Sequence, residues 1–473
     1  MTVRTKAKST AKKPAAPGKR ARKPAQAKPA KSSSAKPAKK AAPAKRAKKK
    51  PEILVERIGH CTLYRGDCRA IMQEMRESSV HAAVCDPPYG LSSEPDMVEV
   101  LEHWLNGDDF AGTAKGFMGK GWDSFVPGPA TWREVARVLK PGGHLAAFSG
   151  SRTYDLMTLA IRLSGLHLRD QAMWLYGSGF PKSLDVSKDI DKRGGGMARP
   201  GWPASSKRCE AVDGQHYERR PKGAAVFDDA KAWSGWGTAL KPAHEPIAIA
   251  RKPLSEGSVS RNVLKHGTGA INIDACRVDA DKRTGWGGQA AGGNTWNASN
   301  CGLGHNGPPT DSEGRWPANV MHDGSLEVAE CFPAGERQAL RFFYSAKAGR
   351  EEREFGMAGC EAKGMPSLNG SFQERGCPPA KNHHPTVKPV DLMRWLIRLT
   401  TPARGTILDP FMGSGSTGIA AVREGVTFIG CEMDHDYFAI ACRRIEAAVR
   451  EAEAQPDLVQ AIERSPAHQL ALI

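Results

Sequence analysis

The sequence predicts an α/β fold, in which helices flank a mostly parallel β-sheet. Short apolar runs typical of buried strands alternate with stretches typical of helices along much of the chain. Two of these strands stop at turns rich in Pro or Gly, the kind of turn found at the ligand-binding edge of such sheets. Apolar residues make up 40% of the 473 residues, which provides a sizeable core and excludes a fully disordered chain.

The positive charge of the chain is concentrated in its first 50 residues. These contain 19 Lys or Arg and no Asp or Glu, whereas the remaining 423 contain 49 basic and 51 acidic residues. The formal net charge of +17 therefore belongs to a tail, and the body is close to neutral. We expect residues 1–50 to be disordered, because they have almost no large apolar side chains to bury, and to contact nucleic-acid phosphates. A solvated tail or a transit-like leader is the alternative.

The cysteine and hydropathy patterns favour an intracellular protein. The 11 Cys form no C-x-x-C pair, which argues against a disulfide framework and for a reducing compartment. No apolar stretch approaches the length of a membrane span, and the N-terminus lacks the apolar segment of a secretory signal. We therefore expect a cytoplasmic location and no membrane partner.

The first half of the body alternates between strands and helices. The apolar run His81–Cys85 is a strand that the following prolines end, and Pro141-Gly142-Gly143 is expected to stop a helix. In chain order we expect a hairpin over 53–64, a helix over 71–75, a strand over 81–85, a helix over 132–139, a strand over 144–148, a helix over 154–163 and a strand over 171–176.

Two polar, Gly-rich regions interrupt this alternation, at about 186–235 and 253–340, and we expect both to be irregular. The strand pattern His244–Arg251 lies between them. After the second region we expect a helix over 390–399, a strand over 406–408, a helix over 418–423, a strand over 426–430 and a helix over 437–451, which Asp434 caps.

A Gly-rich turn follows the strand at 406–408 and opens a helix. Gly413, Gly415 and Gly418 fit the pattern G-x-G-x-x-G, and Glu432 at the end of the next strand is placed to accept both ribose hydroxyls of an adenosine cofactor. Dinucleotide sites and S-adenosylmethionine sites share this pattern. Asp409 favours the second, because its carboxylate would repel a pyrophosphate but attract an ammonium or a sulfonium. The alternative is that this Gly-rich turn only connects the strand to the helix and binds no ligand.

The segment Asp86-Pro87-Pro88-Tyr89 stands at the carboxyl end of the strand over 81–85. The exocyclic amine of a nucleobase is a poor nucleophile, because its lone pair is delocalised into the ring. The Asp86 carboxylate and the Pro87 carbonyl can each accept one N–H of such an amine, and the prolines hold that carbonyl rigidly. Tyr89 offers a face on which an extruded base can stack. A plain turn is the alternative for these four residues.

Together the two segments resemble those of the exocyclic-amino DNA methyltransferases, which modify N6 of adenine or N4 of cytosine. The order, with Asp86–Tyr89 before Asp409–Gly418, is similar to the β group and to prophage-type members of the family. Gly66-Asp67-Cys68, His244–Ile247 and His384–Pro389 also resemble family segments. The resemblance implies a Rossmann-like, S-adenosylmethionine-dependent methyltransferase fold with an inserted target-recognition region.

The resemblance also implies a division of labour along the chain. We expect a tail at 1–50, a catalytic half at 51–252 with an insertion at about 186–235, a target-recognition region at 253–340, a cofactor-binding half at 341–452 and a tail at 453–473. It places the chemistry on Asp86, Pro87, Pro88 and Tyr89, with Asp67 near the cofactor adenine and Thr386 near its methionine end. The full set of expected S-adenosylmethionine ligands is Asp67, Cys68, Thr386, Lys388, Asp409, Pro410, Phe411, Gly413, Ser414, Gly415, Ser416, Thr417 and Glu432.

Other residues that could carry chemistry have simpler explanations. His383 and His384 lack a third ligand at suitable spacing, so we expect no metal. Cys85 is expected to be strand core rather than a nucleophile. Trp286, Trp296 and Trp316 could stack on bases, although such residues more often fill a small core.

The resemblance thus implies a DNA methyltransferase that acts on double-stranded DNA. It favours N6 of adenine over N4 of cytosine as the target, since Asp86 stands where cytosine enzymes of the family more often have Ser. A nicotinamide-dependent oxidoreductase and a non-catalytic DNA-binding protein are the alternatives. The resemblance implies a bacterial or phage-encoded protein that associates with the nucleoid and belongs to restriction–modification systems. The oligomeric state is open, and a homodimer is one alternative.

Overall fold

The chain divides into two units, Met1–Lys50 and Pro51–Ile473, and the fold is that of the second. The basic tail at 1–50 and nearly all of the tail at 453–473 lie outside the residues that the structure describes, as do Trp286 and Trp296. The computed structural model describes residues 53–90, 95–110, 112, 124–179, 183–193, 227–278, 314–331, 342–363 and 379–454.

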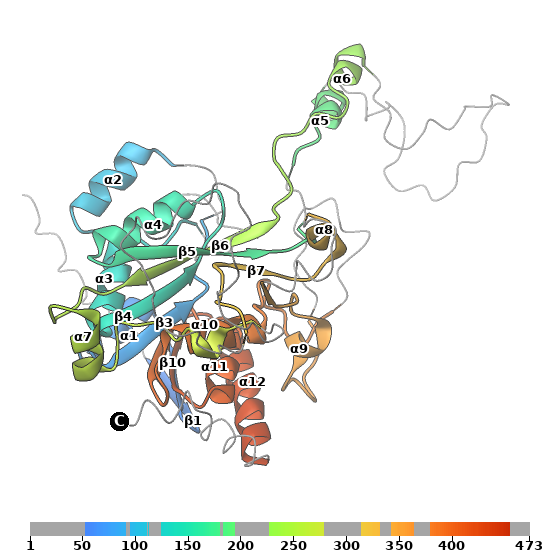
Figure 1. Ribbon diagram of the computed structural model, residues 1–473. Coiled ribbons are helices and arrows are strands. Elements are labelled where there is room, and N and C mark those ends of the chain that lie inside the picture. Colours follow the sequence, from blue (N-terminus) through green and yellow to red (C-terminus); the bar gives the residue numbers. More distant parts are fainter. Residues whose placement is uncertain are drawn as a thin grey trace, which may run out of the picture. The chain divides into compact units, whose positions relative to one another are not determined.

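A mixed sheet of ten strands forms the centre of this unit (Figure 1). The order is β1-β2-β10-β9-β3-β4-β6-β5-β7-β8; β1–β2, β4–β6 and β5–β6 pair antiparallel and the other neighbours pair parallel, which confirms the predicted mostly parallel sheet. The strands are β1 (Leu54–Ile58), β2 (Cys61–Arg65), β3 (Val80–Cys85), β4 (Leu139–Phe148), β5 (His167–Leu175), β6 (His244–Arg251), β7 (Val320–His322), β8 (Phe343–Tyr344), β9 (Thr406–Asp409) and β10 (Thr427–Glu432).

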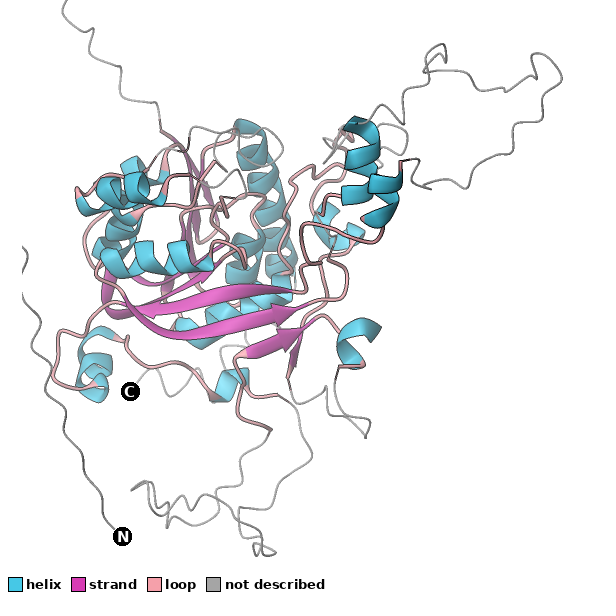
Figure 2. Cartoon of the chain, turned by 90° about the horizontal axis from the view of Figure 1, so that it is seen from above, coloured by secondary structure: helices cyan, strands magenta, loops and turns pink. Residues whose placement is uncertain are grey.

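Helices cover both faces of the sheet (Figure 2), because successive strand residues point to opposite faces and both faces are apolar. In β3, Val84 packs with the core on one face while Ala83 and Cys85 pack with the core on the other, so Cys85 is strand core as expected. The first face carries α10 (Val390–Thr400), α11 (Ser416–Arg423) and α12 (His435–Ala454); the second carries α1 (Cys68–Glu74), α2 (Met97–Leu105), α3 (Pro129–Val138) and α4 (Tyr154–Leu163).

Side-chain caps set the starts of two helices beside the site. The Asp67 carboxylate accepts the Ala70 N–H at 2.9 Å and begins α1. The Asp434 carboxylate accepts the N–H groups of Asp436 and Tyr437, which confirms it as the cap of the last helix. The signal expected to stop α3 was misinterpreted: the helix ends at Val138, and the Pro-Gly-Gly segment lies inside β4 rather than at the helix end.

The two regions expected to be irregular contain regular structure where they are described. Part of 186–235 forms α5 (Val186–Arg193) and α6 (Asp228–Ala232), which pack against each other. The region 253–340 contributes α7 (Val259–His266), a 3-10 turn at Asp274–Cys276, α8 (Leu326–Ala329) and β7, and β7 pairs with β5 in the sheet. These elements are too short for their periodicity to stand out in a Gly-rich sequence, and a three-residue strand depends on its partner. A further short helix, α9 (Arg350–Glu354), follows β8.

Strands β9 and β3 lie side by side at the point where the order of the sheet reverses. They run parallel, with Ala82 opposite Ile407 and Ala83 opposite Leu408. From β9 the chain continues through α11 to β10 on one side, whereas β3 pairs with β4 on the other. Such a reversal opens a crevice at the carboxyl ends of the strands, where ligands bind in this class of sheet.

Among the described residues, no helix combines the length and the apolar character needed to cross a bilayer.

The third glycine of the turn is predicted to be a packing residue. A Cβ at Gly418 would lie 2.8 Å from Ile445 Cγ1 and 2.9 Å from Phe428 Cε1. Gly418→Ala should therefore lower the free energy of unfolding by about 1–3 kcal/mol through overpacking between α11 and α12. Gly257→Ala is the matched control, because its Cβ would meet no atom within 4 Å. Equal unfolding midpoints of the two variants in urea would contradict this assignment.

Candidate active site

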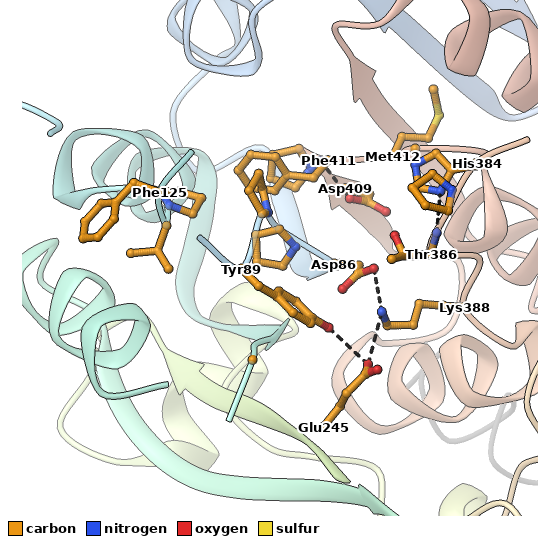
Figure 3. Close-up of a pocket in the computed structure, with 18 of the residues that line it drawn as sticks. Asp86, Tyr89, Phe125, Glu245, His384, Thr386, Lys388, Asp409, Phe411 and Met412 are labelled. Carbon is orange, nitrogen blue, oxygen red and sulfur yellow. Dashed lines mark hydrogen bonds and ion pairs between the residues drawn. The ribbon is translucent and has the colours of Figure 1, made fainter. Parts of the chain in front are cut away.

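The carboxyl ends of β2, β3, β9 and β10 surround one cavity of about 1110 Å³. It is lined both by the segment that follows β3 and by the Gly-rich turn that follows β9, so the fold brings the two predicted segments together (Figure 3). Of the expected site residues, those that line the cavity are Asp67, Cys68, Asp86, Pro87, Pro88, Tyr89, Thr386, Lys388, Asp409, Pro410, Phe411, Gly413, Ser414, Ser416, Thr417 and Glu432.

Gly415 is the one expected ligand residue that does not line the cavity. It precedes α11 with φ at +83°, a left-handed conformation that favours glycine, and a Cβ there would lie 3.1 Å from the Ala441 backbone. Gly415 therefore serves the turn and its packing against α12.

The backbone amides of the Gly-rich turn donate to protein oxygens. The Phe411 N–H donates to Asp409 Oδ1 at 2.9 Å, and the Gly413 N–H donates to Glu432 Oε2 at 2.8 Å. The amides of Met412 and Gly415 donate to carbonyl oxygens. A pyrophosphate needs free amides at such a turn, so these four donors are not available to it, and the carboxylates beside them would repel it.

Two buried carboxyl groups stand beside the turn. Burial raises the pKa of Asp409 to about 7, although the Thr417 hydroxyl donates to it at 2.5 Å. Burial also raises the pKa of Glu432 to about 7, although the Asp434 N–H donates to its Oε1 at 2.7 Å. Each carboxylate oxygen keeps a second acceptor site. A cationic or hydroxyl-bearing ligand suits this side of the cavity, because it would stabilise the ionised carboxylates.

A buried arginine that the sequence did not reveal supports the turn from behind. Arg444 of α12 is fully buried, and its Nη1 donates to the Ser414 carbonyl at 2.7 Å and its Nη2 to the Glu352 carbonyl at 2.9 Å. Burial lowers the pKa of Arg444 to about 10. An arginine on a helix is usually a surface residue, so nothing in the sequence around it pointed to this role.

The other side of the cavity holds a cluster of four charged or polar side chains (Figure 3). The Lys388 ammonium lies 2.6 Å from Asp86 Oδ2 and 3.2 Å from Glu245 Oε2, and the Tyr89 hydroxyl donates to the same Glu245 oxygen at 3.1 Å. Asp86 Oδ1 is buried and accepts no hydrogen bond within the described residues. Burial raises the pKa of Asp86, and the charge of Lys388 opposes that shift.

Two members of this cluster make contacts that the sequence did not predict. Lys388 was expected among the cofactor ligands, yet its ammonium pairs with the carboxylate of the Asp-Pro-Pro-Tyr segment. Glu245 was not singled out, although the segment His244–Ile247 was among those that resemble the family. Burial lowers the pKa of Lys388, but attraction to Asp86 and Glu245 outweighs it and the net shift is upward.

His384 forms part of the cavity wall, which sequence reasoning missed. Its Nδ1 accepts the Thr386 N–H at 3.3 Å, and Arg353 donates to its carbonyl at 2.8 Å. Burial lowers the pKa of His384 to about 3, so the ring is neutral at physiological pH. Within the described ranges, no group of three or more His, Cys, Asp or Glu side chains is arranged to hold a metal ion.

Outside the cavity, Trp316 is not core filler. Its side chain is 66% exposed, and the guanidinium of Arg277 lies 5.5 Å from its ring centroid.

Known proteins similar to this chain are DNA methylases and methyltransferases. A family model described as DNA methylase matches residues 80–443. The type II methyltransferase M.HindIII of Haemophilus influenzae is 23% identical over 405 residues, covering 81% of this chain and 94% of that protein. M2.DpnII of Streptococcus pneumoniae is 47% identical over 64 residues, 14% of this chain and 24% of that protein. The crystal structure of an M1.HpyAVI–SAM complex is 15% identical with a TM-score of 0.33, covering 81% of this chain and 98% of that one.

The raised pKa values predict how stability depends on pH. Between their ordinary values of 3.8 and 4.5 and about 7, Asp409 and Glu432 bind more protons in the folded than in the unfolded protein. Their contribution to stability is therefore largest at low pH and is lost as pH rises toward 7. In thermal unfolding of the ligand-free protein, wild type should lose stability as pH rises from about 4.5 to 7.5, whereas the double variant Asp409→Asn/Glu432→Gln should not. The midpoint temperature of the variant minus that of wild type should therefore increase over this range.

Asp391→Asn is the control for this experiment, because that side chain is 69% exposed. It should keep a constant offset from wild type over the same pH range. A constant offset for the double variant as well would show that the pKa values of the two carboxyl groups are not raised in the folded protein.

Proposed function

Since this chain belongs to the family of N6- and N4-specific DNA methylases, we propose that it transfers a methyl group from S-adenosylmethionine to N6 of adenine in double-stranded DNA. The observation that carries the proposal is the shared cavity, which joins an acceptor pair suited to an amine with a turn suited to a cationic nucleoside. An oxidoreductase is excluded by the family, and a non-catalytic DNA-binding protein would leave both segments without a use.

The side chains of the first segment act on the target amine. Asp86 and the Pro87 carbonyl each accept one N–H, so that the nitrogen lone pair leaves conjugation with the ring and becomes nucleophilic. Tyr89 provides the face on which the extruded base stacks, and Pro88 keeps the segment rigid. Because the transfer is an in-line displacement, holding the amine in line contributes much of the rate.

The residues around the second segment fit S-adenosylmethionine, which supplies an electrophilic methyl group when bound. Asp409 and Glu432 favour a positively charged ligand, and four amides of the turn already donate to protein oxygens instead of being available to a pyrophosphate. Glu432 is placed to accept ribose hydroxyls through its remaining acceptor sites. Asp67, Phe411 and the other lining residues of this side form the wall of the nucleoside site.

The target base and the reading of sequence are the finer parts of the proposal. Asp86 supports adenine, because cytosine enzymes that resemble this chain more often carry Ser at that position. Region 253–340 is the candidate for base readout, and the exposed Trp316, with the guanidinium of Arg277 beside its ring, supports a contact with DNA from its described part. The tail at 1–50 adds sequence-independent contacts to phosphates through its 19 basic residues.

Substitution of the amine acceptor tests the function. Asp86→Asn keeps the size of the side chain but removes its charge, so methyl transfer should fall by about 10²–10³-fold while binding of S-adenosylmethionine persists. The measurement is mass spectrometry of nucleosides from duplex DNA incubated with the protein and labelled S-adenosylmethionine, and N6-methyladenine is the expected product.

Asp391→Asn, which replaces an exposed carboxylate, should methylate at the wild-type rate. N4-methylcytosine as the product would show that the base assignment is wrong. Full activity of Asp86→Asn would show that the assigned role of Asp86 is wrong.

A further inference from the structure

Lys388 makes the most constrained polar contacts in the cavity. Its side chain is 7% exposed, and its ammonium lies between the carboxylates of Asp86 and Glu245. Its nitrogen is 5.4 Å from the ring centroid of Tyr89 and 5.0 Å from that of Phe148. An ammonium has three N–H groups, so two carboxylates and two ring faces account for its surroundings and leave it little freedom to swing toward the Gly-rich turn.

The cluster contains two carboxylates and one ammonium. Ionised Asp86 and Glu245 would repel each other across the site if the ammonium were absent, and one of them would take up a proton. A protonated Asp86 is a poorer acceptor for an amine N–H than a carboxylate is. The ionised form of Asp86, which accepts the amine N–H, therefore depends on the Lys388 ammonium, although Lys388 takes no part in the methyl transfer itself.

The contact to Lys388 also orients the carboxylate of Asp86. It occupies Oδ2 at 2.6 Å, while Oδ1 accepts no hydrogen bond from the described residues. A carboxylate held by one oxygen on a buried ammonium has its second oxygen fixed in space. That second oxygen is left for an incoming amine.

Arg152, Lys241 and Lys347 also line the cavity, but Lys388 is the cation whose charge acts on Asp86. Tyr89 and Tyr176 are raised in pKa by burial and stay neutral hydroxyls, and His384 is neutral because burial lowers its pKa to about 3. The charge of Asp86 in turn contributes to the raised pKa of Asp409, the last residue of β9. Lys388 is thus the cation that balances this side of the site within the described residues.

We propose that Lys388 is a positioning residue that keeps the Asp86 carboxylate ionised and oriented for the target amine. Glu245 is the opposing charge, which shares the Lys388 ammonium and limits how far Lys388 stabilises ionised Asp86. This inference rests on the proposed function of the site. Lys388 touches neither the amine nor the methyl donor in this assignment, and it acts through Asp86.

The test is the pH profile of single-turnover methyl transfer to duplex DNA, measured for wild type, Lys388→Met, Glu245→Gln and the double variant. Activity requires ionised Asp86, so the acidic limb of the profile reports how easily that carboxyl loses its proton. Lys388→Met should move the limb to higher pH by about one unit or more, which lowers the rate by about tenfold at a pH on the acidic limb itself. Glu245→Gln should move the limb to lower pH.

The double variant Lys388→Met/Glu245→Gln carries the same net charge in this cluster as wild type. Its acidic limb should therefore return to within about half a unit of the wild-type position, even if Lys388→Met alone folds poorly. Lys363→Met is the matched control, because Lys363 pairs with Asp436 at 2.8 Å on the surface and does not line the cavity. Its profile should match that of wild type.

Two results would overturn the inference. Rates of Lys388→Met that are lower by one constant factor at every pH would indicate a merely structural role. Weakened binding of S-adenosylmethionine in calorimetry with an unmoved limb would make Lys388 a cofactor ligand instead. Failure of the proposed function looks different, since wild type itself would then leave DNA unmethylated or Asp86→Asn would stay fully active.

Discussion

The parallel pairing of β3 with β9 is the constraint on which the rest of the site depends. It places the end of one strand beside the end of another that lies far along the chain, at the point where the strand order reverses. The Asp86–Tyr89 segment and the Gly-rich turn can each be predicted from local sequence. They come to line one cavity only when this strand pairing forms. Alternating residues of β3 anchor the helical layers on both faces, so the position of the cavity is fixed by the core itself.

Charge is distributed unevenly across this cavity, and the distribution explains its two sides. Around the Gly-rich turn, carboxylates are buried and receive backbone N–H groups, which leaves them ready for a positive ligand. Around Asp86 the arrangement differs, since a buried ammonium lies between two carboxylates and opposes the rise that burial causes in the pKa of Asp86. A methyl donor that carries positive charge and an amine that needs an acceptor thus meet surfaces of complementary character.

Most of the fold and the two principal segments could be predicted from the sequence, because their signals are local. Strands stopped by proline, a glycine turn before a helix, and Asp434 as a helix cap are each visible within about ten residues. The pairing of Lys388 with Asp86 spans 302 positions, and the support that Arg444 gives to the turn comes from a different helix, so neither leaves a local trace. The short strand β7 was not predicted for the same reason, because its three residues form a strand only by pairing with β5.

The central claim is that a methyl donor bound at the Gly-rich turn faces an amine held at Asp86 within one cavity. A crystal structure of the protein with S-adenosylhomocysteine, the demethylated form of the donor, tests it most directly. We predict that the nucleoside lies between Asp67 and Glu432 and that the sulfur points across the cavity toward Asp86. Density for the ligand elsewhere on the protein, or a sulfur turned away from Asp86, would contradict the account.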